Sequence, residues 1–206
     1  MDILTRRDIM KFGAAGLGVM ASGSAFASPR LESRFADQIS PALFNRARAA
    51  MRLHQGRLSH TDRIGIVDFS RPSSSPRFFV VDMASGQRMA HLVAHGRGSD
   101  PAHTGWVQRF SNAPGSFASS GGAYVTCNAY NGAHGRSMRL EGLDSVNSNV
   151  EARAIVVHAA WYVNSEMARA TGLIGRSEGC FAMTNSSRDA VMALLGAGRM
   201  IYADKG

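Results

Sequence analysis

The feature that most limits the fold is a series of short apolar segments, each bounded by turn residues. Ala84-Ser85-Gly86 fits a hairpin turn between two of them. Short strands separated by turn signals predict a mainly-β domain, an antiparallel sandwich or barrel with a few helices at its periphery. The segments expected to be strands are 64–69, 77–83, 87–93, 122–128, 137–140, 153–158 and 200–203.

Three helical stretches are expected beside these strands. Ser40 and Pro41 suit the N-cap and the first turn of a helix that precedes the strands, carries arginines on its outer face and ends near Gly56. A helical turn is expected over 166–171. Asn185 or Ser186 should cap a last helix that runs to about 195.

The N-terminal 27 residues have the pattern of an export signal. A twin-arginine motif, Arg6-Arg7, precedes a short Gly/Ala-rich apolar stretch, and Ala25-Phe26-Ala27 fits a cleavage site. The predicted organisation is a signal peptide over 1–27, a polar lead-in and helix over 28–60, and a catalytic domain over 61–206. We therefore expect the twin-arginine translocase as an export partner and a location in the periplasm or cell envelope.

The formal net charge of +8 favours an acidic partner. The predicted signal peptide carries three basic and two acidic residues, so its removal leaves +7. No run of basic residues with interleaved aromatics marks a nucleic-acid surface, so a nucleic-acid partner is not expected. No later segment is long and apolar enough to be predicted to span a membrane.

Cys180 is the predicted nucleophile. It follows the Gly-bearing turn Gly175-Arg176-Ser177-Glu178-Gly179, and His158 ends an apolar strand upstream. A neighbouring imidazolium can lower the pKa of a thiol, and the same imidazole can protonate a leaving amine. The sequence thus predicts a Cys180–His158 pair, with a backbone carbonyl, that of Ala159, holding the imidazole tautomer. Ser177 and Gly179 are expected to shape the turn, whose amides could stabilise an oxyanion.

The chain has only one other cysteine, Cys127. A disulfide between the two is the simplest expectation in an oxidising compartment, and it would abolish this chemistry. We favour free thiols, because a chain of this size needs no covalent staple and twin-arginine substrates are generally exported folded. The histidines show no tight metal-ligand spacing, so neither zinc nor any other cofactor is expected.

The chain resembles the murein L,D-transpeptidase catalytic-domain family, the YkuD-type cysteine transpeptidases. The resemblance covers about Ile64 to Tyr202 in many separate blocks in the right order. The blocks are 67–72, 93–96, 109–112, 114–116, 130–132, 134–135, 137, 139–140, 142–143, 147, 157–158, 162–163 and Gly175-Arg176-Ser177-x-Gly179-Cys180.

This resemblance implies a YkuD-like β domain that acts on peptidoglycan stem peptides. Cys180 matches the family's nucleophile and His158 its base. The thiol would attack the carbonyl at the L-centre of the third, diamino-acid residue and release D-Ala. The acyl group would then pass to an amine of a neighbouring stem. The residues expected to contact substrate are His134, Arg139, Tyr162 and Arg176.

Several positions depart from the family's pattern. Many relatives have an Arg shortly after the Cys, where this chain has Ala182 and Met183, so Arg176 or Arg139 is expected to recognise a carboxylate instead. Glu178 places an acid beside the thiol, which would raise the pKa of the thiol. Two alternatives stay open: an L,D-carboxypeptidase that uses water, and an inactive wall-binding module. A sortase-like enzyme would need an Arg shortly after the Cys, for which Arg188 is the nearest candidate, but the other blocks do not fit that family.

Overall fold

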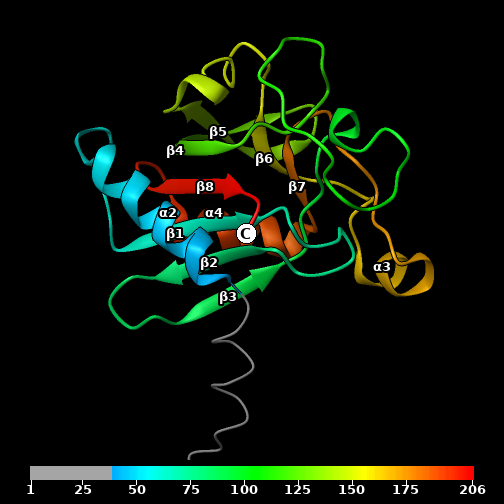
Figure 1. Ribbon diagram of the computed structural model, residues 1–206, viewed down its shortest axis with the longest axis horizontal. Coiled ribbons are helices and arrows are strands. Elements are labelled where there is room, and N and C mark those ends of the chain that lie inside the picture. The colour runs from blue at the N-terminus through cyan, green and yellow to red at the C-terminus, as the bar shows by residue number, and fades with distance from the viewer. Residues whose placement is uncertain (1–38) are drawn as a thin grey trace, which may run out of the picture.

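The computed structural model describes residues 39–206 (Figure 1). The predicted signal peptide and most of the predicted lead-in lie outside the described residues. The helices are α2 (Pro41–Leu53), α3 (Ser165–Thr171) and α4 (Asn185–Leu195). The strands are β1 (Arg63–Asp68), β2 (Phe78–Asp82), β3 (Arg88–His91), β4 (Gly122–Gly132), β5 (Gly135–Gly142), β6 (Val156–Ala159), β7 (Phe181–Met183) and β8 (Met200–Asp204).

The strands form one eight-stranded mixed sheet in the order β3-β2-β1-β8-β4-β5-β6-β7. The pairs β1–β8 and β6–β7 are parallel, and the other neighbouring pairs are antiparallel. The prediction of a mainly-β domain with an N-terminal helix is confirmed. Every expected strand is present in part, whereas β7 was not expected.

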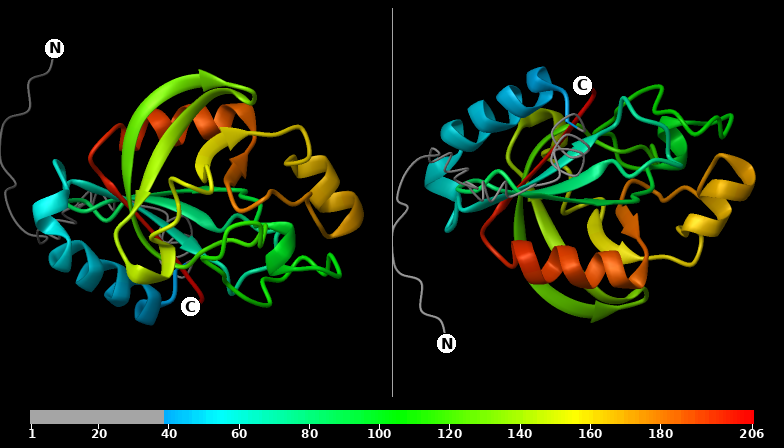
Figure 2. Two further views of the ribbon diagram at one scale, coloured as in Figure 1. Left: turned by 90° about the horizontal axis from the view of Figure 1, so that it is seen from above. Right: turned by 90° about the horizontal axis from the view of Figure 1, so that it is seen from below.

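The sheet rolls around one large apolar core. Phe78 of β2 and Phe181 of β7 stand near opposite ends of the strand order, yet their ring centroids lie 6.2 Å apart. After β3, the Ala94 amide donates to the Ala182 carbonyl at 2.9 Å, which links the two ends of the sheet. The curved β4–β5 hairpin lies over α4 (Figure 2), and the apolar face of this helix, Val191, Met192 and Leu195, joins the core.

Helix α2 covers the opposite face of the sheet (Figure 1). Its start follows the sequence closely, because the Ser40 hydroxyl accepts the Leu43 amide at 3.1 Å and Pro41 occupies the first turn. Leu43 and Ala47 are buried in a second apolar cluster that includes β1, β2 and β8. None of the helices within 39–206 combines the length and apolar character needed to cross a membrane.

Candidate active site

Strands β6 and β7 bring the two predicted catalytic side chains to neighbouring parts of the sheet. The strands pair in parallel, with Val157 opposite Phe181 and His158 opposite Ala182. Val157 and Phe181 both pack in the core. His158 therefore points from the other face of β6, since successive strand residues alternate. Cys180 is the last residue of the turn that begins at Gly175, and it directly precedes β7.

The Cys180 sulfur lies against the start of β6. Its Sγ is 3.5 Å from the Ala154 carbonyl oxygen, to which the thiol donates. Burial raises the pKa of the Cys180 thiol, and the Glu178 carboxylate raises it further, whereas the Val156 amide and the Arg153 guanidinium lower it. Val156 is the first residue of β6, and His158 is two residues further along the same strand.

The carbonyl that receives the thiol belongs to a residue in an unusual conformation. Ala154 has φ = 52°, in the left-handed region that a non-glycine residue rarely adopts. A tight turn fixes it there, because its amide donates to the Glu151 carbonyl at 2.9 Å and the Ile155 amide donates to that of Val150 at 3.0 Å. Backbone strain of this kind persists where the surrounding structure holds it, often at functional sites.

The tautomer of His158 is set by its own strand. Nδ1 donates to the Ala159 carbonyl at 2.9 Å, the contact that the sequence analysis expected. In the neutral ring Nε2 is therefore an acceptor, as a general base must be. Burial lowers the pKa of His158, and the Ala159 hydrogen bond partly opposes this. The His134 ring stacks on it with centroids 4.3 Å apart, so His134 lies at the site.

The turn before Cys180 is fixed by Ser177. Its hydroxyl donates to the Cys180 carbonyl at 2.7 Å and accepts the Gly179 amide at 3.2 Å. Gly179 has φ = +118°, and a Cβ added there would come within 2.8 Å of the Ala118 carbonyl oxygen. Ser177 and Gly179 therefore both shape the turn, and the Gly179 amide donates its hydrogen bond within the turn.

A buried polar network of Arg77, His95 and Asp100 is hydrogen-bonded to this turn. The Arg77 side chain, fully buried, donates to His95 Nδ1 at 2.7 Å, and His95 Nε2 faces Asp100 Oδ2 at 3.3 Å. Because Nδ1 accepts, Nε2 carries the proton and donates to the carboxylate. The His95 carbonyl in turn accepts the Ser177 amide at 2.9 Å. The sequence does not reveal this network, since no local pattern marks Arg77 as buried.

The pKa values of two groups in this network, Arg77 and His95, are shifted strongly. Burial lowers the pKa of Arg77 to about 9, although Asp68 and Asp100 raise it. Burial, together with the Arg77 charge, lowers the pKa of His95 to about 4. His95 is therefore neutral at physiological pH, which agrees with its role as acceptor from Arg77 and donor to Asp100.

The other predicted substrate-binding residues are Tyr162, Arg139 and Arg176, and they differ in the contacts that they make. Tyr162 is close to the thiol: its pKa is raised to about 12 by burial, and by the Cys180 and Glu178 charges. Arg139 stacks on the Tyr130 ring at 4.2 Å and lines a pocket beside β6. Arg176 donates to the Asp100 and Pro101 carbonyls and so is engaged within its loop. Their contacts with substrate stay predictions.

Arg153 is a site residue that the sequence analysis missed. Its Nη1 donates to the Ser111 carbonyl at 2.8 Å and to Ser120 Oγ at 2.7 Å, which holds the guanidinium beside the turn. It lines a pocket of about 140 Å³ with Glu178 and Phe117. Its spacing from Cys180 gives no sequence signal, because the contact depends on the path of the intervening chain.

Both cysteines are free. Within 39–206, no three His, Cys, Asp or Glu side chains are grouped so that they could hold a metal ion. The site thus contains the Cys180 thiol, with the Val156 amide and the Arg153 guanidinium acting on it. The His158 imidazole, whose tautomer is fixed, lies two residues beyond Val156 on β6. Such a set can carry out acyl transfer through a thioester.

A protein-family profile described as L,D-transpeptidase catalytic domain matches residues 36–203. No curated protein matches the chain. Among solved structures, an L,D-transpeptidase from Mycobacterium smegmatis is similar at 11% identity over 69% of this chain and 58% of that one, with a TM-score of 0.43.

Two further solved structures are similar at comparable levels. L,D-transpeptidase 3 from Mycobacterium tuberculosis, in complex with a faropenem-derived adduct, has 12% identity over 70% of this chain and 60% of that one, with a TM-score of 0.42. The helical cell shape determining protein from Campylobacter jejuni has 10% identity over 72% and 49%, with a TM-score of 0.46. The chain thus spans less than two thirds of the length of each.

Proposed function

The chain belongs to the L,D-transpeptidase catalytic-domain family, and from this premise we propose that it is a cysteine acyltransferase acting on peptidoglycan stem peptides. The observation that carries the proposal is the position of the Cys180 sulfur at the start of β6, the strand that holds His158 with Nδ1 donating to Ala159. The base and the group that orients it belong to this short strand, and the nucleophile lies against the residues that lead into it.

In the acylation step, Cys180 attacks the carbonyl carbon at the L-centre of the third stem residue. The thiol proton passes to His158 Nε2 as the C–S bond forms. The tetrahedral intermediate then breaks its C–N bond, and the protonated imidazole gives that proton to the departing D-Ala amine. The products are a thioester on Cys180 and free D-Ala.

In the transfer step, an amine of a neighbouring stem attacks the thioester carbon. The C–N bond forms, the C–S bond breaks, and a proton taken from the amine by His158 returns to the sulfur. With water as the attacking group, the product is a trimmed stem and the enzyme acts as an L,D-carboxypeptidase. Both outcomes use the same acyl-enzyme.

We also propose that the protein acts in the periplasm or cell envelope, where its substrate lies. The twin-arginine pattern at Arg6-Arg7 and the basic net charge support this, since the wall polymer carries carboxylates. Fractionation of cells that express the full chain, with and without Arg6→Lys and Arg7→Lys, tests the location. The proposal fails if the protein stays in the cytoplasm in both cases.

Turnover of a defined muropeptide tests the function. Purified protein is incubated with disaccharide-tetrapeptide, and the products are weighed by mass spectrometry. Release of D-Ala with crosslinked dimers supports transfer, and release of D-Ala with tripeptide alone supports hydrolysis. Cys180→Ala should form neither product. A wild-type protein that binds peptidoglycan but releases no D-Ala would instead be a wall-binding module.

A further inference from the structure

The turn before Cys180 lacks one of the oxyanion donors that the sequence analysis expected of it. The Gly179 amide donates to Ser177 Oγ at 3.2 Å, inside the turn itself. An amide has a single N–H, so this one is not available to a substrate oxygen. A tetrahedral intermediate on Cys180 still needs a positive group beside its oxyanion.

The Arg153 guanidinium lies against the same turn. A Cβ added to Gly179 would come within 3.1 Å of Arg153 Nη2, so the missing side chain at this position lets the guanidinium approach the backbone that carries the nucleophile. Its charge also acts on the sulfur. Burial raises the pKa of the Cys180 thiol, and Arg153 is one of the two groups that lower it.

Arg153 is held in place from its backbone to its tip. Its amide donates to the Asn149 carbonyl at 2.8 Å. Its Nη1 donates to the Ser111 carbonyl and to Ser120 Oγ, and its Nη2 donates to the Ala118 carbonyl. These bonds use three of the five guanidinium N–H groups, and the other two have no partner in the described part of the chain. A donor fixed in this way needs little reorganisation when negative charge develops.

The positive charge of Arg153 is not neutralised by a carboxylate within the described residues. Glu178 lines the same pocket but pairs with Arg97 at 3.0 Å. The two groups whose anions would act on Arg153 are Tyr124 and Cys180. Burial raises the pKa of Tyr124 far above its usual value, so this phenol stays neutral. In the free protein, the Cys180 thiolate is therefore the anion that this half-buried cation can stabilise.

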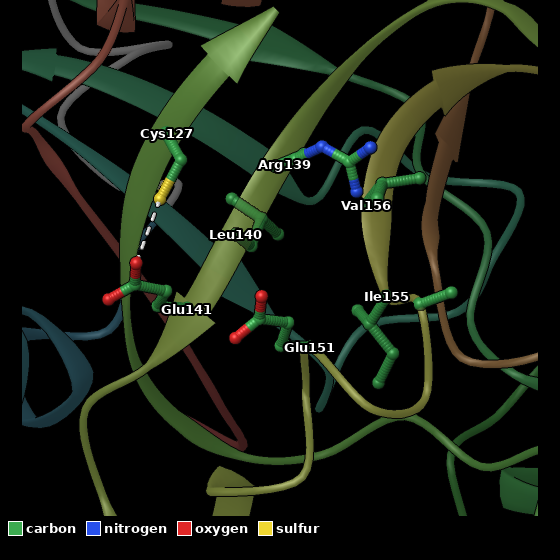
Figure 3. A pocket seen from close by; sticks show the side chains of 8 residues that line it. Cys127, Arg139, Leu140, Glu141, Glu151, Ile155 and Val156 are labelled. Atoms are coloured by element: carbon green, nitrogen blue, oxygen red, sulfur yellow. Dashed lines mark hydrogen bonds between the residues drawn. The ribbon is translucent and has the colours of Figure 1, made fainter. Parts of the chain in front are cut away.

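A second cation near β6 occupies a different pocket. The Arg139 guanidinium lies beside Val156, in a pocket of about 70 Å³ that Arg153 does not line (Figure 3). Arg153 instead lines the pocket of about 140 Å³ that also contains Gly115 and Phe117. A cavity needs about 10–15 Å³ for each water-sized group, so this pocket leaves room for substrate atoms next to the Arg153 guanidinium.

We propose that Arg153 is a catalytic residue, and that its guanidinium stabilises the negative charge that forms first on the Cys180 sulfur and then on the carbonyl oxygen of the substrate. The inference rests on the proposed function. It assigns to one side chain, 27 positions before the nucleophile in the sequence, the task that the Gly179 amide cannot perform.

The acylation step balances with Arg153 in this role. As the thiol proton passes to His158 Nε2, an electron pair of the sulfur forms the C–S bond, and the π electrons of the carbonyl move to its oxygen. An unused N–H group of Arg153 donates to that oxyanion. The carbonyl then re-forms, the C–N bond breaks, and His158 gives its proton to the leaving amine. Arg153 keeps its own proton throughout.

Two reagents separate the effect on the oxyanion from the effect on the thiolate. In a Cys127→Ser background, iodoacetamide alkylates Cys180 without forming an oxyanion, whereas p-nitrophenyl acetate acylates it through one. Intact mass gives the alkylation rate, and the burst of p-nitrophenolate gives the acylation rate. At pH 7, Arg153→Gln should slow alkylation about threefold and acylation about 100-fold. The ratio of acylation to alkylation should therefore fall at least about tenfold.

Two further variants distinguish charge from general support of the fold. Arg153→Lys keeps the charge but not the planar fork of donors, so alkylation should stay within about twofold of the wild type while acylation remains slower. Arg109→Gln is the matched control, because Arg109 also anchors a loop, with Nε donating to the Gly98 carbonyl at 3.0 Å. It removes the same charge and should leave the ratio unchanged. If Arg153→Gln does not fold, as judged by urea unfolding, Arg153→Lys decides.

The outcomes separate this inference from the proposed function. Neither reagent requires turnover of peptidoglycan. If the wild-type protein releases no D-Ala from disaccharide-tetrapeptide, the proposed function fails, while the ratio still decides the role of Arg153. If the wild-type protein releases D-Ala and Arg153→Gln keeps the wild-type ratio, the inference is wrong and the function stands. Equal slowing of alkylation and acylation would show that Arg153 only supports the turn, and would also overturn the inference.

Discussion

The surroundings of Cys180 shift the pKa of its thiol in opposite directions, and only some of the groups responsible are close to it in the sequence. Burial and Glu178 raise the pKa of the thiol, and the Val156 amide and Arg153 lower it. Burial also lowers the pKa of His158. Both shifts favour a neutral thiol and a neutral imidazole at rest, so the proton moves as substrate is attacked. The sequence analysis expected an imidazolium to activate the thiol and foresaw the effect of Glu178, but not Val156 or Arg153.

The rate at which Cys180 is alkylated should therefore rise with pH over a wide range. In a Cys127→Ser background, iodoacetamide labelling of the resting enzyme should speed up about tenfold for each pH unit between about 6 and 9, because only the thiolate reacts. Mass spectrometry of quenched samples gives the rates. A plateau that begins below about pH 7 would instead show a thiolate–imidazolium pair at rest.

Replacing Glu178 should make the thiol more reactive. Glu178 is 65% exposed and pairs with Arg97 at 3.0 Å, so its influence on the sulfur is screened by solvent. Glu178→Gln should speed alkylation of Cys180 at neutral pH by about twofold, an advantage that high salt reduces. Glu166→Gln serves as the control. A slower reaction in Glu178→Gln would mean that Glu178 holds the turn in place.

At the scale of elements, the turn from Gly175 to Cys180 depends on the segment after β3. The Ser177 amide donates to the His95 carbonyl, and the Arg97 amide donates to that of Ser177 at 2.8 Å. The turn is thus bound into the sheet like a short strand. A nucleophile held this way keeps its position when substrate binds, which proximity catalysis requires.

Gly179→Ala should disable the site. An alanine at φ = +118° is strained, and its Cβ would lie 2.8 Å from the Ala118 carbonyl oxygen, so the turn must move. A displacement near 1 Å costs about 100-fold in turnover. Gly86→Ala is the matched control, since Gly86 also has positive φ (+71°) but nothing lies within 4 Å of an added Cβ. The expectation is wrong if D-Ala release by Gly179→Ala matches that of Gly86→Ala.

The sequence predicted most elements but not the shortest ones. Strands with strong apolar runs and helices with clear caps were found, as at Ser40. β7 escaped because Phe181–Met183 is three residues long and fully buried, so it shows no alternation. β6 begins at Val156 rather than 153, because the left-handed Ala154 ends the preceding turn. The cap of α4 is Thr184, one residue before the cap that was expected.

At the scale of the whole molecule, closure of the rolled sheet makes the site. The ends of the sheet meet where the Ala94 amide donates to the Ala182 carbonyl at 2.9 Å. Composition and strand count indicated a sandwich or barrel, but they could not indicate which strands meet. The Arg77–His95–Asp100 network shows the same limit, since its members come together only when the roll has closed.

Stability should fall in mild acid because of this network. His95 is fully buried, and its pKa is lowered to about 4 in the folded protein from 6.5 in the unfolded chain. The unfolded state therefore binds the extra proton first, so stability is full above about pH 6.5 and declines towards pH 4. The loss from this group is about 3 kcal/mol.

Urea unfolding at pH 7 and at about pH 4.5 measures this loss. His95→Gln should lower stability at pH 7 and reduce its dependence on pH, whereas His60→Gln, at an exposed position, should change neither. His91 and His158, whose pKa values burial also lowers, leave part of the dependence in place. A slope in His95→Gln equal to that of the wild type would exclude the network as its source.

The proposed mechanism requires a covalent acyl-enzyme at Cys180, which can be detected by mass. The intact protein is incubated with a carbapenem, weighed, and mapped by proteolysis. We expect one adduct per chain, on the peptide that contains Cys180, retained in Cys127→Ser and lost in Cys180→Ala. An adduct on Cys127, or no adduct on the folded wild-type protein, would contradict this mechanism.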